Sequence, residues 1–520
     1  MNGVSPSLNE PPPQTELVIG LVGAVGIDLN RVAAEIGYVL SKFAYKTHDL
    51  HLTDQLPSLD WDFELTREPY DERVWSYMTA GNELRERWDR LDAFGLLAIN
   101  QISLARKNES GDHKIPLDRQ AYILRSLKRR EEVSLLRKVY GSRFILLSIY
   151  APEKARRRYL KNRIQQSRVL PAQPTPKYSA KRLIERDNSE SIAFGQDVVG
   201  TFHRGDFFID ATRKLRSQLK RTFEIIFGHP YRTPTRDEFG MFQAIAASKR
   251  SAELGRQVGA AICTSDGSVV AVGTNEVPRP GGGLYWPGDP GDAREFKNGR
   301  DSSDQRKRRI AKRIAEELMA AECITEGIRR KDVQRMVERT ELDDLTEFVR
   351  AVHAEMAALM EAARRGIAVS DTVMYSTTFP CHHCARHIVA SGIKRVIYIA
   401  PYPKSLVGDL HPDAITIDPR RRYKVHRRVT FEPFVGVGPR RYLELFDMPK
   451  RKKKNGKTLK FRPMSALPRV SGLEPPDLRT DLLPYIRREA RALDLLVTIQ
   501  DKRGPKLASG EGPEDSTTSD

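Results

Sequence analysis

The chain has 520 residues, of which 39% are hydrophobic and 30% are charged, and its formal net charge is +19. This length allows two or three domains with cores of their own, and no apolar run approaches the ~20 residues that a membrane-spanning helix needs. Four cysteines are too few for a disulfide framework and are typical of a reducing compartment. The composition therefore favours a globular cytoplasmic protein and excludes membrane-spanning and disulfide-rich secreted proteins.

A short leader precedes the first folded segment. Residues 1–15 are predicted to be disordered, and they lack the basic and apolar regions of a secretory signal. Residues 16–22 form an apolar run typical of a buried strand, and a glycine turn over 23–28 leads into an amphipathic helix over 29–42. Strand, glycine turn and helix are the layout of a phosphate-binding loop. The candidate nucleotide-binding residues are Gly20, Gly23 and Gly26.

The glycine turn departs from a Walker A loop at two positions. Ile27 and Asp28 stand where that loop has lysine and then serine or threonine. Isoleucine supplies no charge to a phosphate, and an aspartate at the magnesium-binding position repels one. The loop is therefore degenerate, and we do not expect ATP hydrolysis.

Helices and strands alternate from the glycine turn to residue 230. Helices are predicted over 71–92 and 117–139, and strands over 144–150 and 206–210. The alternation predicts a parallel sheet flanked by helices, which resembles a P-loop nucleotide-kinase-like domain over residues 16–230. The alternative is an α/β scaffold that only docks on a catalytic domain.

The second half opens with a helix and a hairpin after a proline-bearing break at 233–235. The helix is predicted over 236–251, and strands over 257–263 and 269–273 are joined by an Asp-Gly turn. A long insertion follows over 280–345. Beyond it the chain alternates again, with helices at 353–365 and 380–391 and strands at 372–376 and 394–399.

Two motifs in this half carry the strongest chemical signal. His353-Ala354-Glu355 is followed, after 24 residues, by Pro380-Cys381-His382-His383-Cys384. One imidazole and two thiolates make three zinc ligands, His353, Cys381 and Cys384, and leave the fourth tetrahedral position for water, as in catalytic zinc sites. Zinc lowers the pKa of such a water toward ~7. Glu355 lies within one helical turn of His353, so we predict that it moves protons at the site without binding the metal.

The alternative interpretation is a structural zinc site, which has four protein ligands. His382, His383 or His387 could supply the fourth. A structural site has no use for Glu355 at this offset, so the pattern favours catalysis. We take the extra histidines as ordinary helix residues, with a second metal as the alternative.

The spacing H-x-E followed by P-C-x-x-C resembles the signature of zinc nucleobase deaminases. Residues 249–399 resemble the deoxycytidylate deaminase family more narrowly, through the stretches 256–260, 273–275 and 392–398 beside the two motifs. The resemblance implies that Asn275 contacts the nucleotide sugar and that the Ala354 backbone lines the base pocket. It makes Arg250 and Arg256 candidates for phosphate contact, and it implies a homo-oligomer.

The whole architecture resembles bacterial anti-phage dCTP/dCMP deaminases, in which a degenerate P-loop domain precedes the deaminase domain, with Thr-Pro-Thr-Arg-Asp-Glu (233–238) at the junction. The resemblance implies hydrolytic deamination of dCTP or dCMP to deoxyuridine nucleotides, which depletes the pool available to a phage. It also implies that activity is held in check, in some systems by a partner RNA. The first domain would then sense a nucleotide or RNA and gate the site.

The predicted fold class is α/β, with a P-loop kinase-like parallel-sheet domain over 16–230 and a cytidine-deaminase-like three-layer α/β/α domain over 231–447. A basic extension over 448–520 ends in a disordered tail. Basic runs at 420–428 and 450–454 favour a polyanionic partner, although a solvated basic tail is an equal alternative. They also support an alternative function, a deaminase that edits cytosine or adenine in RNA or single-stranded DNA. Aromatic residues are not interleaved with these runs as stacking platforms, which counts against that function.

Overall fold

The structure is a computed structural model in which the described residues are 16–168, 174–188, 190, 192–340, 342, 345, 347–402, 405–418, 428–448, 453–454, 456–469 and 484–504. The predicted disordered leader, the tail beyond residue 504 and most of the two basic runs lie outside the described residues. Within the described part of the chain, no helix has both the length and the apolar character that a membrane span requires.

The chain forms two compact units, and their boundaries differ from the predicted domains. Unit 1 comprises residues 1–233 together with 435–520, and unit 2 comprises residues 234–434. The described residues beyond Phe434 belong to unit 1. The short strand β12 (Gly436–Val437) pairs there with β5 (Phe207–Asp210), and Val437 lies in its core.

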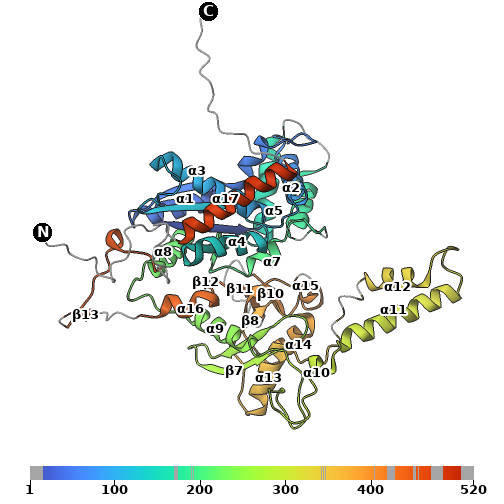
Figure 1. Ribbon diagram of the computed structural model, residues 1–520. Coiled ribbons are helices and arrows are strands. Elements are labelled where there is room, and N and C mark those ends of the chain that lie inside the picture. The colour runs from blue at the N-terminus through green and yellow to red at the C-terminus, as the bar shows by residue number, and fades with distance from the viewer. Residues whose placement is uncertain are drawn as a thin grey trace, which may run out of the picture. The chain divides into compact units, whose positions relative to one another are not determined.

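Unit 1 is built on a six-stranded sheet in the order β12-β5-β4-β1-β3-β2 (Figure 1). Its parallel strands are β1 (Leu17–Gly23), β2 (Lys46–His51), β3 (Gln120–Arg125), β4 (Phe144–Tyr150) and β5. Successive residues of β1 enter opposite cores, because side chains alternate along a strand. Val18 and Val22 lie in one apolar cluster, and Ile19 and Leu21 lie in the other.

Helices cover both faces of this sheet. The face of Ile19 packs against α1 (Leu29–Ser41) and α8 (Leu215–Ile226), and the face of Val18 packs against helices α2 to α4 and α17. The remaining helical elements of unit 1 are η1 (Leu52–Ser58), α2 (Tyr70–Trp88), α3 (Ala93–Ser110), α4 (Arg130–Tyr140), η2 (Gly141–Arg143), α5 (Glu153–Ser167), α6 (Pro176–Asn188), α7 (Val198–Phe202), α16 (Pro439–Phe446), η4 (Pro463–Ser465) and α17 (Pro484–Arg503). A small hairpin joins β13 (Lys453–Lys454) to β14 (Lys457–Thr458).

The predicted helix over 117–139 is wrong in its first part. Residues 120–125 form β3, which is paired on both sides, with β1 and with β2. The residues from Ala121 to Leu124 are all buried, so sheet pairing and burial override the helical pattern. The predicted strands at 144–150 and 206–210 are confirmed as β4 and β5.

A buried ionic network holds α17 on unit 1. The guanidinium of Arg106, on α3, donates to Glu16 at 3.0 and 3.1 Å and to Glu489, on α17, at 2.7 and 3.1 Å. The hydroxyls of Tyr122 and Tyr485 also donate to Glu16. All three charged side chains are buried. Glu16 and Glu489 therefore meet at one cation, although they lie 90 and 383 positions away from Arg106 in the sequence.

Unit 2 contains a second six-stranded sheet in the order β10-β11-β9-β8-β6-β7. The strands are β6 (Gly259–Cys263), β7 (Val269–Thr274), β8 (Val373–Thr378), β9 (Arg395–Ala400), β10 (Ile415–Ile417) and β11 (Val429–Pro433). β6 forms an antiparallel hairpin with β7 and is antiparallel to β8, while β8, β9, β11 and β10 are parallel. The prediction of an α/β protein is confirmed, and both sheets are mixed and mostly parallel.

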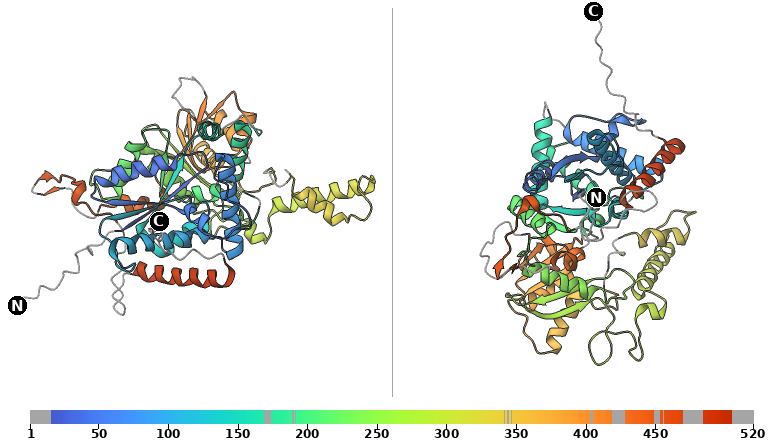
Figure 2. Two further views of the ribbon diagram at one scale, coloured as in Figure 1. Left: turned by 90° about the horizontal axis from the view of Figure 1, so that it is seen from above. Right: turned by 60° about the vertical axis from the view of Figure 1, so that its left-hand side comes forward.

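Helices also cover both faces of the second sheet. α13 (Ala354–Arg364) and α14 (His382–Ala390) contribute to the core on one face, and α9 (Arg236–Ser248) packs on β6 and β8. A short helix, α15 (Val407–Leu410), follows β9. The predicted insertion contains α10 (Glu295–Asn298), α11 (Ser302–Ala320) and α12 (Arg330–Glu338), and the last two form a helical hairpin that extends from the rest of unit 2 (Figures 1 and 2).

We predict that Arg106→Met strongly destabilises unit 1. The change leaves Glu16 and Glu489 buried without their cation, and breaking a buried ion pair in this way costs about 3–5 kcal/mol. Denaturant unfolding can be followed by the fluorescence of Trp61, Trp75 and Trp88, which all lie in unit 1.

Lys46→Met is the matched control, because it removes a lysine from the exposed ion pair with Glu109 on the same unit. Exposed pairs contribute little to stability, so the unfolding midpoint of this variant should stay at the wild-type value. Equal midpoints for Arg106→Met and the wild type would contradict the role assigned to the buried network.

Candidate metal centre

Two helix N-termini place the three predicted metal ligands. His353 is the N-cap residue of α13, and Cys381 is the N-cap residue of α14, with Cys384 in the first turn of the same helix. A backbone bridge between Glu276 and Val352 fixes the chain immediately before His353. Pro380 precedes α14, in keeping with its expected place near a helix start.

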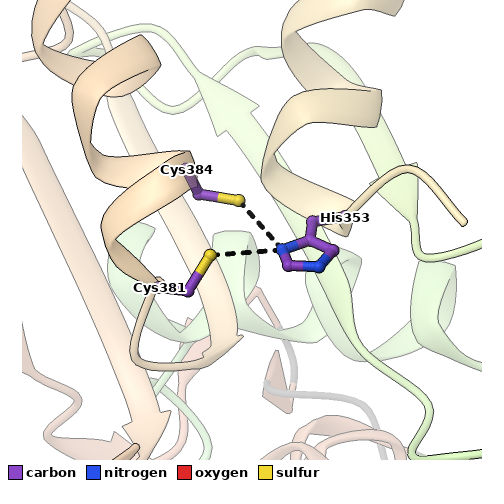
Figure 3. A group of neighbouring side chains, drawn as sticks. All are labelled: His353, Cys381 and Cys384. Carbon is purple, nitrogen blue, oxygen red and sulfur yellow. Dashed lines mark hydrogen bonds between the residues drawn. The ribbon is translucent and has the colours of Figure 1, made fainter. Parts of the chain in front are cut away.

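The three ligand atoms converge on one point (Figure 3). The Sγ atoms of Cys381 and Cys384 lie 3.2 and 3.4 Å from Nδ1 of His353. A tetrahedral zinc with ordinary bond lengths would separate a nitrogen and a sulfur ligand by about 3.5 Å. The donor set and its spacing therefore fit zinc, and one coordination position remains for a non-protein ligand.

The three ligand side chains shift one another's pKa values. Hydrogen bonds from Cys384 and His353 lower the pKa of the Cys381 thiol to about 3. The hydrogen bond with Cys381 raises the pKa of His353. The pKa of Cys384 is raised well above its usual value, because it donates to the Cys381 thiolate and is buried. Both thiols lie at the N-terminus of α14, whose dipole stabilises thiolates.

Glu355 lies beside the cluster in the first turn of α13. Its side chain is 4% exposed, and the Ser376 hydroxyl, on β8, donates to its Oε1 at 2.8 Å. Burial raises the pKa of the Glu355 carboxyl. The structure thus places a desolvated carboxylate with one fixed oxygen next to the metal ligands. No sequence motif marks Ser376, which is found only through the register of β8.

Two additional histidines of α14, His382 and His383, form a second group with Glu347. Nε2 of His383 lies 3.4 Å from a carboxylate oxygen of Glu347, and the rings of His382 and His383 are 4.5 Å apart. These three residues could also hold a metal ion by the spacing of their ligand atoms. They contribute no ligand to the first cluster.

The predicted substrate residues lie around the same region of unit 2. Oδ1 of Asn275 accepts from the Val258 amide at 2.7 Å, and its Nδ2 donates to the Arg256 carbonyl at 2.9 Å. Asn275 therefore fixes the main chain of this loop, while the side chain of Arg256 is exposed. Ala354 is fully buried at the start of α13.

Arg250 is placed differently from the other predicted substrate residues. Its guanidinium stacks 3.7 Å from the ring centre of Trp286 and donates to the carbonyls of Leu284 and Tyr285. It also lines a cavity of about 680 Å³ together with residues of α13. The insertion loop thus fixes the position of the Arg250 guanidinium.

The predicted glycine loop of unit 1 already holds an anion, and that anion belongs to the chain. The Asp187 carboxylate accepts from the Val25 amide at 2.6 Å and from Lys128 Nζ at 2.7 Å. Asp28 caps α1 by accepting from the Arg31 amide. At Gly20 and Gly26 a side chain would lie within 2.8 Å of neighbouring atoms, so these two glycines permit close packing. No motif marks Lys128 or Asp187.

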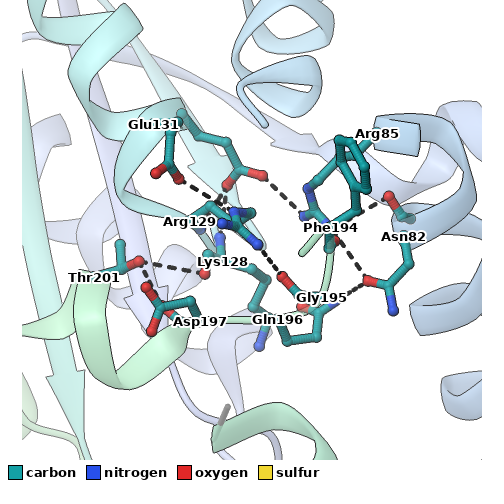
Figure 4. A network of polar contacts seen from close by, with 12 residues as sticks. Asn82, Arg85, Lys128, Arg129, Glu131, Phe194, Gly195, Gln196, Asp197 and Thr201 are labelled. Carbon is teal, nitrogen blue, oxygen red and sulfur yellow. Dashed lines mark hydrogen bonds and ion pairs between the residues drawn. The ribbon is translucent and has the colours of Figure 1, made fainter. Parts of the chain in front are cut away.

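A cavity of about 470 Å³ lies beside this loop. It is lined by aromatic and cationic side chains, among them Tyr70, Arg73, Phe94, Arg125 and Arg163. A polar network next to it joins α2, the segment before α4 and the segment before α7 (Figure 4). In it Arg85 donates to the Glu132 carboxylate at 2.9 Å, and Gln196 donates to Asn82.

Comparisons with known proteins point to the same region of unit 2. A model of the cytidine and deoxycytidylate deaminase zinc-binding region matches residues 234–400. Deoxycytidylate deaminase of enterobacteria phage T2 is 42% identical over 57 residues, which are 11% of this chain and 30% of the phage protein. A probable deoxycytidylate deaminase of Drosophila melanogaster is 25% identical over 218 residues, which are 41% of this chain and 85% of the fly protein.

Among solved structures, dCMP deaminase of the cyanophage S-TIM5, in complex with dCMP and dUMP, is 18% identical. The match covers 37% of this chain and 92% of that one, with a TM-score of 0.21. The chain spans about 30% of the length of the phage relative. All three residues of the metal cluster lie inside the region matched by the family model. Residues 234–400 are therefore a cytidine and deoxycytidylate deaminase zinc-binding region, and it contains the cluster of His353, Cys381 and Cys384.

Proposed function

We propose that the protein catalyses zinc-dependent hydrolytic deamination of deoxycytidine nucleotides, dCTP or dCMP, to deoxyuridine nucleotides. The observation that carries the proposal is the buried Glu355 carboxylate beside a three-ligand cluster in a deaminase zinc-binding region. Three protein ligands are typical of catalytic zinc, and a carboxylate that is not a ligand is what the reaction needs for proton transfer.

The residues of the chain would divide the work as follows. His353, Cys381 and Cys384 would hold zinc, which acts as a Lewis acid and activates a water for attack on C4 of cytosine. Glu355 would accept a proton from the attacking water and pass it to N3, and would then carry the proton of the C4 hydroxyl to the amino group, which leaves as ammonia. Ser376 holds Oε1 of Glu355, so Oε2 is the oxygen that we assign to proton transfer.

The substrate contacts are proposed on the resemblance and on the placement of the residues. Asn275 would shape the sugar subsite through its bonds to the 256–258 loop, and the Ala354 backbone would line the base pocket. The exposed guanidinium of Arg256 suits a phosphate contact better than that of Arg250, which is held by the insertion loop.

The wider role rests on the resemblance of the whole architecture. We propose that the activity depletes deoxycytidine nucleotides in the cytoplasm during phage infection, and that the protein is a homo-oligomer. We assign regulation by a nucleotide or RNA to unit 1, whose fold supports a kinase-like origin through its parallel strand order 2-3-1-4-5. Since Asp187 holds the loop amide of Val25, Gly23 and Gly26 would line the cavity, whereas Gly20 packs against Leu127 and Phe144.

A substrate panel tests the proposed function directly. Full-length protein is incubated with dCTP, dCMP and a cytosine-bearing oligonucleotide, with and without cellular RNA, and uracil is measured in each. We expect uracil in the free nucleotides. Uracil in the oligonucleotide alone would contradict the proposal and support the alternative of a polynucleotide-editing deaminase.

Glu355→Gln should abolish turnover while the metal stays bound. The glutamine keeps the shape of the side chain but cannot accept the proton, and general acid–base catalysis contributes about 10²- to 10⁴-fold. Ammonia release from deoxycytidine nucleotides should therefore fall by at least about 100-fold. Glu361→Gln, on the same helix, serves as the control and should keep wild-type turnover. Wild-type turnover in Glu355→Gln would exclude the assigned role.

Cys384→Ser should lose zinc, because it removes one of three protein ligands. Metal analysis of the purified protein should show less than one zinc per chain. The matched control is Cys263→Ser, which changes a buried cysteine of β6 outside the cluster. This control should keep its zinc. Equal zinc content in the two variants would contradict the ligand assignment.

A further inference from the structure

A second group of potential ligands in unit 2 contains only carboxylates. Glu253 lies in the loop before β6, Glu295 is the first residue of α10, and Asp301 is the N-cap residue of α11. One carboxylate oxygen from each lies within 4.8 Å of those of the other two. Three separate segments of the chain therefore bring acidic groups to one place.

The carboxylate of Glu295 is buried there with an unused oxygen. The side chain is 5% exposed, and its Oε2 accepts from the Ser302 amide at 3.1 Å. Its Oε1 is buried and has no hydrogen-bond partner among the described residues, and the same holds for Oε2 of Glu253. Buried polar atoms normally have partners, so two unpartnered carboxylate oxygens within one acidic group indicate a missing cationic ligand.

The neighbouring arginines do not supply that charge. Arg294 is paired with Asp292 at 2.7 Å and lies 3.8 Å from Glu276. Within the described part of the chain, no ion pair joins a lysine or arginine to Glu253, Glu295 or Asp301. Burial, together with the charges of Glu295, Asp301 and Glu276, raises the pKa of the Glu253 carboxyl. The group is therefore a concentration of negative charge without an internal counterion.

We propose that Glu253, Glu295 and Asp301 bind a hard divalent cation such as Mg²⁺ or Mn²⁺. Oxygen-only donor sets select these cations, whereas the nitrogen and sulfur set around His353 selects zinc. The two sites thus differ in chemistry, and loading one does not require the other.

The position of the cation site indicates which class of substrate the protein takes. This inference rests on the proposed function. Glu253 lies three residues from both Arg250 and Arg256. The Ser251 hydroxyl donates to the Asn275 carbonyl at 2.8 Å, and the Ala252 amide donates to the Glu276 carboxylate at 3.0 Å. The cation therefore sits on the loop that carries the proposed phosphate contacts.

A polyphosphate would meet this loop as a complex with the cation. Three carboxylates repel a bare phosphate chain, but a divalent cation held by them attracts it and accepts its oxygens as further ligands. A nucleoside monophosphate offers fewer oxygens to such a cation. The favoured substrate is therefore a deoxycytidine triphosphate with its divalent cation, in preference to the monophosphate.

Mn²⁺ binding tests the cation site without any substrate. Zinc-loaded full-length protein is titrated with Mn²⁺, and the free ion is measured by electron paramagnetic resonance. We expect one bound Mn²⁺ that Mg²⁺ displaces, and at least a tenfold weaker affinity in Glu253→Gln/Glu295→Gln. Asp304→Asn, an exposed change in the first turn of α11, is the matched control and should bind as the wild type does. Equal affinity in the double variant and the wild type would overturn the site.

Thermal unfolding separates this site from a merely structural cluster. Without divalent cations the double variant should melt at a higher temperature than the wild type, because two repelling charges are gone. With saturating Mn²⁺ the wild type should gain stability and the double variant should not. A double variant that melts lower in the absence of Mn²⁺ would show that the carboxylates stabilise the fold by themselves, and would overturn the proposal.

Substrate preference tests the second step. In the presence of Mg²⁺ the ratio of kcat/KM for dCTP to that for dCMP should fall at least tenfold in the double variant and stay unchanged in Asp304→Asn. An unchanged ratio in a double variant that has lost Mn²⁺ binding would overturn the assignment of the triphosphate. A wild-type protein that binds Mn²⁺ but deaminates neither nucleotide would refute the proposed function while the cation site stands.

Discussion

The convergence of two helix N-termini at one buried point is the constraint on which the rest of unit 2 depends. His353 begins α13, and Cys381 and Cys384 begin α14. The depth of α13 is set by Gly273 on β7, because a Cβ atom at that position would lie 2.2 Å from the Ala354 carbonyl. Any larger residue would displace the start of the helix, and with it both a ligand and the Glu355 carboxylate. The close approach of β7 to the Ala354 carbonyl therefore fixes the start of α13.

The parts of this arrangement that depend on local spacing could be predicted from the sequence. The separation of His353 from Glu355, and of Cys381 from Cys384, already fits one helical turn, and the Asp-Gly turn correctly joins β6 to β7. The parts that depend on tertiary pairing could not. β3 lies within the segment 117–139 that was predicted to be helical, and only its position between β1 and β2 makes it a strand.

Polar contacts between residues far apart in the chain could not be predicted from the sequence either. Ser376 reaches Glu355 across 21 residues, and Glu489 reaches Arg106 across 383. The C-terminal extension was predicted from its basic residues, whereas nothing in the sequence marks Glu489 as a buried acid. A carboxylate that meets a buried arginine looks the same in a sequence as one that meets solvent, and burial is what makes the difference to stability.

Unit 1 and unit 2 differ in how their buried carboxylates are paired. In unit 1, Asp187 satisfies the loop amide of Val25 and is itself neutralised by Lys128. A loop that resembles a phosphate site is therefore complete without a phosphate. In unit 2, the carboxylates of Glu253 and Glu295 keep buried oxygens that no described residue satisfies. Whether the buried polar atoms of a site already have hydrogen-bond partners is therefore better evidence for a ligand than resemblance to a binding motif. The satisfied loop argues against an anion at Val25, and the unsatisfied acids argue for a cation beside the deaminase site.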